Sequence, residues 1–212
     1  MIKILIVDDH AILREGLIRI IQFESDMEVA GSVKNASEAI HALSGQPVDV
    51  VILDINMPGR SGLDIIKDIK QLQPNAAVLM LSMYSEERFA IRALKAGASG
   101  YLTKDMATEE LITAIRILHS GRKYITATLA ENMANSLQEK TEKNLHDCLS
   151  DREFEVMCMI GSGKSVNEIA EVLSLSSRTV STYRSRILVK MNLVNTARIM
   201  QYAISQGLVD NN

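Results

Sequence analysis

The sequence predicts two domains: a (βα)5 doubly wound parallel sheet, an α/β fold, over residues 1–120, and an all-α domain over residues 149–212. Short runs of aliphatic and β-branched residues, such as those at 4–7 and 50–53, suit strands buried on both faces. Apolar residues at helical spacing separate these runs, whereas only helical patterns occur beyond residue 148. A chain of 212 residues has room for both domains.

Five strands and the helices between them account for residues 1–120. Thr108 is expected to cap the last helix of this domain, and Gly97 is expected to end the helix before it. Strand-like segments lie near 3–8, 27–33, 48–53, 77–82 and 99–103. The helical patterns are carried by Ile12, Leu13, Leu17, Ile20 and Ile21, by Ile65, Ile66 and Ile69, by Ala90, Ile91, Leu94 and Ala98, and by Leu111, Ile112, Ile115 and Leu118.

Residues 121–148 differ in character and are predicted to form a partly helical linker. Its later part is charged and nearly free of large apolar residues, whereas 128–137 keeps a helical pattern. The domain that follows opens with a capping box, in which Ser150 caps a helix and Glu153 is its third residue. A helix over 165–173, a short break and a second helix from about Arg178 then form a helix-turn-helix pattern.

Composition and charge narrow the class of protein. No apolar stretch reaches the roughly eighteen residues of a membrane span, and the N-terminus does not have the pattern of a secretory signal. Cys148 and Cys158 lack metal-ligand spacing and are expected to be reduced thiols in a cytoplasmic protein. Residues 1–120 carry 12 basic and 16 acidic side chains, a balance of −4, whereas residues 149–212 carry 7 and 6, a balance of +1. Total charge alone therefore does not indicate a nucleic-acid partner.

Polar side chains follow four of the predicted strands. Asp8 and Asp9 end the first strand, Asp54 ends the third, and Ser82 and Lys104 follow the fourth and fifth. Open α/β sheets place their sites at the carboxyl ends of the strands, so these side chains are expected to converge. Carboxylates there would hold a hard divalent cation, and one of them could attack phosphorus. The alternative is that the first two acids only cap the helix that begins at 10–11.

This constellation resembles the receiver domain of two-component response regulators, over all of residues 1–120. The resemblance implies that Asp54 accepts a phosphoryl group from a sensor histidine kinase. It also implies an Mg²⁺ cofactor, with Asp9, Asp54 and the backbone carbonyl of Asn56 as ligands and with Asp8 acting mainly through water. Mg²⁺ does favour a few carboxylates together with waters and phosphate oxygens.

Three further receiver residues have roles implied by the same resemblance. Lys104 would pair with one phosphoryl oxygen, the Ser82 hydroxyl would donate to another, and Tyr101 would turn inward when Ser82 moves. Ser82 stands where threonine is commoner, and Asp105 stands where proline usually follows the lysine. The first departure keeps the hydroxyl, and the second removes a cis-proline from consideration.

The helix-turn-helix and its flanks resemble the LuxR-type four-helix DNA-binding domain, over 149–209. The segments that carry this resemblance are 149–153, 161–165, 167–170 and 178–180. The whole chain therefore resembles a NarL/FixJ-type response regulator, which implies a double-stranded DNA partner and a second helix in the major groove. The candidate DNA-contacting residues are Ser177, Arg178, Thr179, Ser181, Thr182, Arg184, Ser185, Arg186 and Lys190.

We therefore predict a phosphorylation-controlled transcription regulator, which is not an enzyme beyond its own phosphoryl transfer and dephosphorylation. The weak charge of 149–212 favours a homodimer when phosphorylated, because two copies on a palindrome add phosphate contacts. Two alternatives belong to other classes: a phosphatase with an aspartyl nucleophile, and a phosphorylation-independent DNA-binding protein or adaptor. Asn56 counts against the phosphatase, since it cannot supply the carboxylic proton of a general acid.

Overall fold

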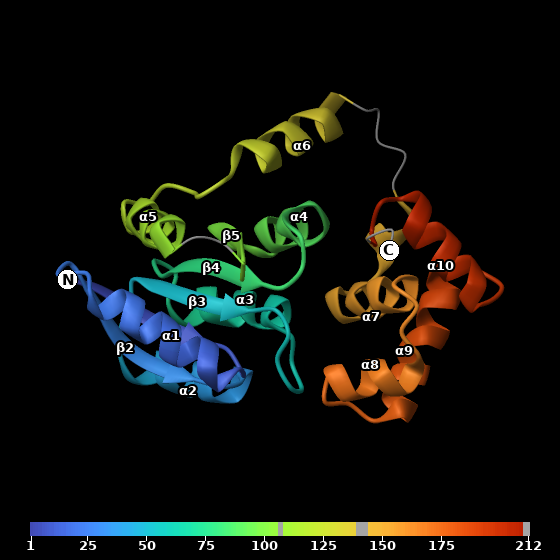
Figure 1. Ribbon diagram of the computed structural model, residues 1–212, viewed down its shortest axis with the longest axis horizontal. Coiled ribbons are helices and arrows are strands. Elements are labelled where there is room, and N and C mark those ends of the chain that lie inside the picture. Colours follow the sequence, from blue (N-terminus) through green and yellow to red (C-terminus); the bar gives the residue numbers. More distant parts are fainter. Residues whose placement is uncertain (106–107, 139–143, 210–212) are drawn as a thin grey trace. The chain divides into compact units, whose positions relative to one another are not determined.

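The structure is a computed structural model that describes residues 1–105, 108–138 and 144–209. The chain divides into two compact units, Met1–Gln138 and Glu139–Asn212, which are described separately below. Figure 1 follows the elements of each unit along the chain. In the described residues, no helix is both long and apolar enough to cross a membrane.

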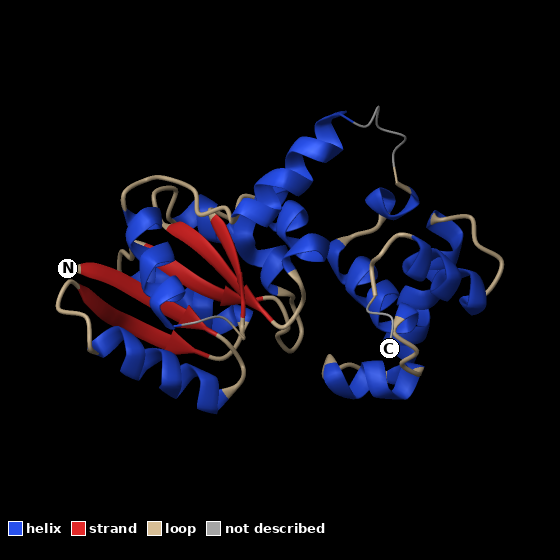
Figure 2. Ribbon diagram, turned by 45° about the horizontal axis from the view of Figure 1, so that its top comes forward, coloured by secondary structure: helices blue, strands red, loops and turns tan. Residues whose placement is uncertain are grey.

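The first unit is built on a five-stranded sheet in which every pairing is parallel, in the order β2-β1-β3-β4-β5. Helices lie on both sides of this sheet (Figure 2). The strand order reverses between β1 and β3, and open α/β sheets place their ligand crevice at such a switch point. The strands are β1 (Ile2–Val7), β2 (Met27–Val33), β3 (Val50–Asp54), β4 (Ala77–Ser82) and β5 (Gly100–Thr103).

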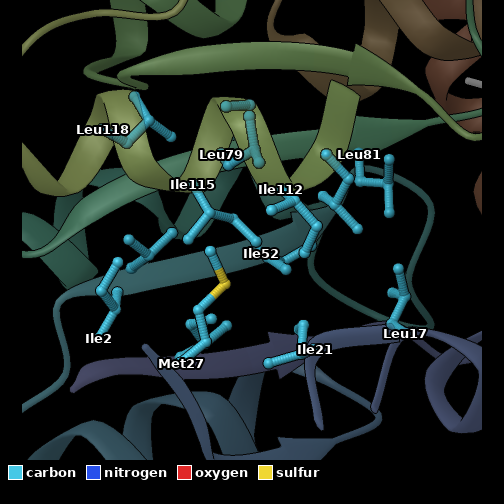
Figure 3. Packing of buried hydrophobic residues seen from close by; sticks show 14 of the residues in the cluster. Ile2, Leu17, Ile21, Met27, Ile52, Leu79, Leu81, Ile112, Ile115 and Leu118 are labelled. Atoms are coloured by element: carbon cyan, nitrogen blue, oxygen red, sulfur yellow. The ribbon is translucent and has the colours of Figure 1, made fainter. Parts of the chain in front are cut away.

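One face of the sheet is covered by α1 and α5. Leu17 and Ile21 of α1 and Ile112 and Ile115 of α5 belong to one buried cluster with strand residues such as Ile52 (Figure 3). The strands β1, β3 and β4 are buried almost throughout, which explains why they appear in the sequence as nearly unbroken apolar runs, whereas the edge strand β2 is mostly half-buried or exposed. The helices of this unit are α1 (Ala11–Gln22), α2 (Ala36–Gly45), α3 (Gly62–Leu72), α4 (Glu86–Ala96), α5 (Thr108–His119) and α6 (Ala127–Gln138).

The helix α6 belongs to the first unit. Leu129 is fully buried, and the Thr126 hydroxyl donates to a carboxylate oxygen of Glu86, at the start of α4, over 2.6 Å. The segment before α6 also pairs with the sheet, since Tyr124 forms an isolated parallel bridge with Gly100. Apolar contact and hydrogen bonds therefore fasten the helical part of the expected linker to the receiver-like unit.

The second unit is entirely helical in its described residues. The box of Ser150 and Glu153 caps α7, and a second box of Ser165 and Glu168 caps α8. Val180 and Ile187 of α9 are fully buried, whereas the opposite face of that helix is exposed. The elements are η1 (Leu145–Cys148), α7 (Asp151–Gly161), α8 (Val166–Val172), α9 (Ser177–Lys190) and α10 (Thr196–Ser205).

The predicted fold class is confirmed, and the strand boundaries agree with the predicted ones to within two residues. Gly97 ends α4 in a left-handed conformation, with φ at 115°, as expected. The alternative that Asp8 and Asp9 only cap α1 is wrong: His10 is the N-cap, and its side chain makes no capping hydrogen bond. Asp8 Oδ1 accepts from the His10 backbone N–H at 2.7 Å, just outside the helix. Thr108 is the first residue of α5, and the position before it lies outside the described residues.

Candidate functional site

The three acids predicted to converge lie together at the carboxyl edge of the sheet. Asp54 is the last residue of β3, and Asp8 and Asp9 follow directly after the neighbouring strand β1. Ligand-type oxygens of these acids and a ring nitrogen of His10 all lie within 4.8 Å of one another. Asp8 and Asp54 are almost completely buried, with 2% and 1% of their surface exposed. Parallel pairing of β1 with β3 is what gathers the acids at this point.

Lys104 connects two of these acids. Its Nζ lies 2.7 Å from Oδ2 of Asp54 and 2.7 Å from Oδ2 of Asp8, and only 5% of its side chain is exposed. The residue directly follows β5, and its backbone N–H donates to the Ser82 carbonyl over 2.8 Å. The ends of β4 and β5 therefore place the ammonium over the acidic cluster, as the sequence predicts.

Burial controls the charge of this cluster. Desolvation first and the Asp8 carboxylate next raise the pKa of Asp54, Lys104 opposes both, and the balance leaves the pKa at about 6. Burial also disfavours the charged form of Lys104, but Asp54 and Asp8 outweigh it and raise the pKa of the ammonium. At neutral pH the site therefore holds an ionised but poorly solvated carboxylate, which is suited to act as a nucleophile.

Ser82 and Tyr101 are joined through the loop that follows β4. The Ser82 hydroxyl accepts a hydrogen bond from the backbone N–H of Tyr84 at 3.2 Å. Tyr101 is 1% exposed, and its hydroxyl donates to the Tyr84 carbonyl over 2.7 Å. The Tyr84 ring in turn stacks on Phe89 of α4, with ring centroids 4.4 Å apart. The hydroxyls of Ser82 and Tyr101 therefore both bond to the backbone of Tyr84.

The donor set fits a hard divalent cation. Oδ1 of Asp9 is buried and is contacted only by the His10 ring nitrogen, at 2.9 Å, among the described residues. Oδ1 of Asn56 is also buried without a hydrogen-bond partner in that part of the chain. Clustered carboxylate oxygens of this kind are typical of Mg²⁺ sites. That the His10 ring lies beside these acids was not predicted from the sequence, although its position directly after Asp9 could have suggested it.

The candidate DNA-contacting residues of α9 differ in how exposed they are. Arg178, Thr182, Ser185 and Arg186 lie on its exposed side, where the spacing of four and three residues makes one stripe. Arg178, Thr182 and Arg186 also line one surface hollow. Ser177 and Lys190, at the ends of the helix, are exposed as well, whereas Thr179, Ser181 and Arg184 are half-buried.

Several of the predicted DNA-contacting groups already have partners within the unit. The Nζ of Lys190 lies 2.6 Å from Oε2 of Glu153, the residue that completes the capping box of α7. The Thr182 hydroxyl donates to the Arg178 carbonyl over 2.9 Å. The exposed Val189, with 80% of its surface accessible, was not among the predicted residues, because an aliphatic position near a helix end looks like core in a sequence.

Comparison with known proteins places the chain in one family. A model of the response regulator receiver domain matches residues 4–116, and a model of the bacterial regulatory proteins of the luxR family matches residues 147–203. The chain therefore belongs to the DNA-binding response regulators of two-component systems, of the NarL/FixJ type. This confirms the predicted class and excludes the phosphatase alternative.

Individual relatives extend over nearly the whole chain. The response regulator UvrY of Escherichia coli strain K12 is 38% identical over 210 residues, which cover 98% of this chain and 96% of UvrY. The response regulator GacA of Pseudomonas aeruginosa strain PAO1 is 34% identical over 211 residues, 99% of each chain. Among solved structures, the RcsB response regulator of Salmonella typhimurium has a TM-score of 0.58 and 25% identity, and covers 96% of this chain and 98% of its own. A complex of RcsB with DNA has a TM-score of 0.60, again at 25% identity, covering 96% of this chain and 98% of that one.

Proposed function

We propose that Asp54 is the phosphoacceptor of this response regulator and that a sensor histidine kinase supplies the phosphoryl group. The observation that carries the proposal is the buried cluster in which Lys104 lies 2.7 Å from both Asp54 and Asp8. Asp54 stands at the end of the central strand β3, whereas Asp8 and Asp9 follow the neighbouring strand β1. Its raised pKa adds support, because a poorly solvated carboxylate attacks phosphorus more readily.

The proposed transfer is a single displacement at phosphorus. A carboxylate oxygen of Asp54 forms the new O–P bond while the P–N bond to the kinase histidine breaks, and the imidazole leaves with the electron pair. Lys104 then exchanges its contact with Asp54 for one with a phosphoryl oxygen, and the Ser82 hydroxyl donates to another. The same groups would support later hydrolysis of the acyl phosphate, so the receiver serves its own phosphorylation and dephosphorylation only.

Asp9, Asp54 and the backbone carbonyl of Asn56 are the proposed Mg²⁺ ligands, and Asp8 would act mainly through a bound water. When bound, Mg²⁺ would neutralise negative charge on the transferred group. Asp9 and Asp8 differ in how free their oxygens are to bind a metal ion. Asp9 presents a buried oxygen with little competition, whereas Asp8 is already engaged by Lys104.

In the second unit, α9 is the proposed recognition helix. Its exposed stripe offers Arg178 and Arg186 for phosphates or guanine, and Thr182 and Ser185 for weaker contacts to bases. Ser177, Thr179, Ser181, Arg184 and Lys190 complete the proposed contact set, mainly as phosphate contacts and supports. That a relative has been solved with DNA supports this assignment.

The proposed functional domains are a receiver over 1–120, a linker over 121–148 and a DNA-binding domain over 149–212. We propose that the phosphorylated protein is a homodimer on double-stranded DNA in the cytoplasm. Twofold pairing is supported by the weak charge of the second domain, since a second copy doubles the number of phosphate contacts.

A chemical labelling experiment tests the phosphoacceptor. Wild-type protein and Asp54→Asn are incubated with Mg²⁺ and a small acyl phosphate, and the intact masses are measured. We expect a single phosphoryl adduct on the wild type, lost in the variant and in excess chelator. An adduct of equal yield on Asp54→Asn would contradict the assignment, and equal yield in chelator or in Asp9→Ala would contradict the proposed metal site.

A further inference from the structure

The segment that leads from α5 to α6 is docked along the free edge of the sheet. The Tyr124 backbone N–H donates to the Ser99 carbonyl over 3.0 Å, and Tyr124 bridges to Gly100 at the start of β5. A Cβ on Gly100 would meet the Tyr124 Cβ at 3.0 Å and its carbonyl oxygen at 3.2 Å, so the close approach depends on the glycine. The linker is therefore held against the edge strand of the receiver.

Tyr124 also fastens the linker to α5. Its hydroxyl donates to Oε1 of Glu110 over 2.9 Å. Burial first, then Glu110 and Glu86, together raise the pKa of Tyr124 to about 12. The phenol therefore stays protonated at neutral pH and remains a donor.

Thr126 couples the start of α6 to the start of α4. Its hydroxyl accepts from the Leu129 backbone N–H at 3.1 Å, as an N-cap does, and donates to Oε2 of Glu86 over 2.6 Å. The Thr126 carbonyl also accepts from the Ala130 N–H at 3.0 Å. A single side chain thus caps α6 and ties it to a carboxylate of α4, so a movement of Glu86 changes the support of the first turn of α6.

Glu86 is the first residue of α4 and lies four residues after Ser82, at the end of the loop that follows β4. The Ser82 hydroxyl holds the N–H of Tyr84, and Tyr101 holds its carbonyl. If the Ser82 hydroxyl turns toward a phosphoryl oxygen, the first of these bonds changes geometry, and the segment that carries Glu86 shifts with it. This route consists of two hydrogen bonds, at Ser82 and at Thr126, joined by a short covalent segment.

We propose that Glu86 and Thr126 form a latch that holds the linker helix α6 on the receiver and opens when Asp54 is phosphorylated. The inference rests on the proposed function of Asp54. Because α6 leads into the second unit along the chain, opening the latch loosens the tether of the DNA-binding domain. Glu86 is a positioning residue in this scheme, since it acts on α6 through the Thr126 hydroxyl.

Hydrogen–deuterium exchange of the full chain tests the latch. The amides of Leu129 and Ala130 report directly, because both bond to Thr126. Treatment with Mg²⁺ and a small acyl phosphate should raise their exchange in the wild type by roughly tenfold, the equivalent of losing one charge-assisted hydrogen bond. Glu86→Ala leaves the cap of α6 in place but removes the latch, so its exchange should be high without the phosphoryl donor and should rise little further with it.

Three variants serve as controls. Thr126→Ser keeps the donor and the charged acceptor of the latch and should respond like the wild type, whereas Glu86→Gln keeps only a neutral acceptor and should show a smaller rise. Thr128→Val removes an exposed hydroxyl from the same helix and should also leave exchange unchanged. Low exchange and a full response in Glu86→Ala would overturn the latch, and so would unchanged exchange in fully phosphorylated wild type. Intact mass from the same samples shows whether Asp54 carries a phosphoryl group. If it carries none, the proposed function of Asp54 is contradicted, and so is the proposal that phosphorylation opens the latch.

Discussion

At Asp54, one buried carboxylate is subject to opposing influences. Burial and the neighbouring Asp8 favour its protonated form, whereas Lys104 and a backbone hydrogen bond from Asn56 favour its ionised form. Burial prevails, and the pKa lies near 6 instead of 3.8. The native protein therefore retains a proton that the unfolded chain releases between about pH 4 and pH 6. The contribution of Asp54 to stability therefore falls as the pH rises through this range, because at this group the folded state binds more protons than the unfolded chain.

Asp54→Asn should therefore be more stable than the wild type at pH 7 in the presence of chelator. We expect a gain of up to about 3 kcal/mol in the free energy of unfolding, since each unit of pKa shift corresponds to about 1.4 kcal/mol. The gain should vanish below about pH 4, where the carboxyl group is protonated in both states. Urea denaturation from pH 4 to pH 7 measures this, with the exposed Asp105→Asn as a matched control. A pH-independent difference between wild type and Asp54→Asn would contradict the electrostatic account.

Lys104→Ala should destabilise the protein by about 3–5 kcal/mol at pH 7, because it leaves two buried carboxylates facing each other without their shared cation. At pH 5 the loss should be smaller, since a protonated Asp54 needs no cation. The free energy of unfolding at both pH values checks this, and Lys95→Ala, an exposed lysine on α4, serves as the control. Equal stability of Lys104→Ala and the wild type at pH 7 would show that Lys104 does not stabilise the cluster.

At the scale of the elements, an ion pair joins Lys190, the last residue of α9, to Glu153 of α7. Glu153 accepts from the Ser150 backbone N–H at 2.8 Å as part of the capping box and from Lys190 at 2.6 Å. Burial is the largest single effect on Glu153 and raises its pKa, but Lys190 and the contacts with Ser150 together outweigh it and lower the pKa. Lys190 is therefore partly neutralised before any DNA phosphate reaches it, and the proposed phosphate contact has to compete with this carboxylate.

Glu153→Gln should increase DNA affinity and make it depend more steeply on salt, by up to about one counterion for each half-site. Glutamine still completes the capping box, so only the charge is removed. Fluorescence anisotropy with operator and scrambled DNA, at several salt concentrations, measures the effect. Glu168→Gln, the same change in the capping box of α8, is the matched control. If the two variants bind DNA identically, Lys190 does not contact phosphates.

Most elements, and the composition of the receiver site, could be predicted from the sequence. Buried parallel strands leave unbroken apolar runs, and the residue after each run falls at the carboxyl edge of the sheet, which is why Asp54 and Lys104 could be paired. Contacts between residues distant in sequence had no such signal. The bond from Thr126 to Glu86 and the ion pair of Glu153 with Lys190 depend on how helices pack, which spacing within one helix does not determine.

At the scale of the whole molecule, the charge balance bears on how DNA is bound. A domain with a balance of +1 gains little from charge alone, so a dimer should bind far more tightly than a monomer. Phosphorylation is therefore expected to shift the protein from monomer to dimer, with half-sites about one helical turn apart. Sedimentation of the wild type with and without acyl phosphate and Mg²⁺ measures this shift, with Asp54→Asn as the control. An unchanged sedimentation coefficient in fully phosphorylated protein would contradict it.

The central claim is that the phosphoryl group on Asp54 controls DNA binding by the second domain. The most direct test titrates the wild type and Asp54→Asn against operator DNA, with and without acyl phosphate and Mg²⁺, while intact mass records phosphoryl occupancy. We predict that phosphorylation raises the affinity of the wild type by at least about tenfold, a coupling of about 1.4 kcal/mol, and leaves Asp54→Asn unchanged. Equal affinities for phosphorylated and unphosphorylated wild type, at full occupancy of Asp54, would contradict the claim.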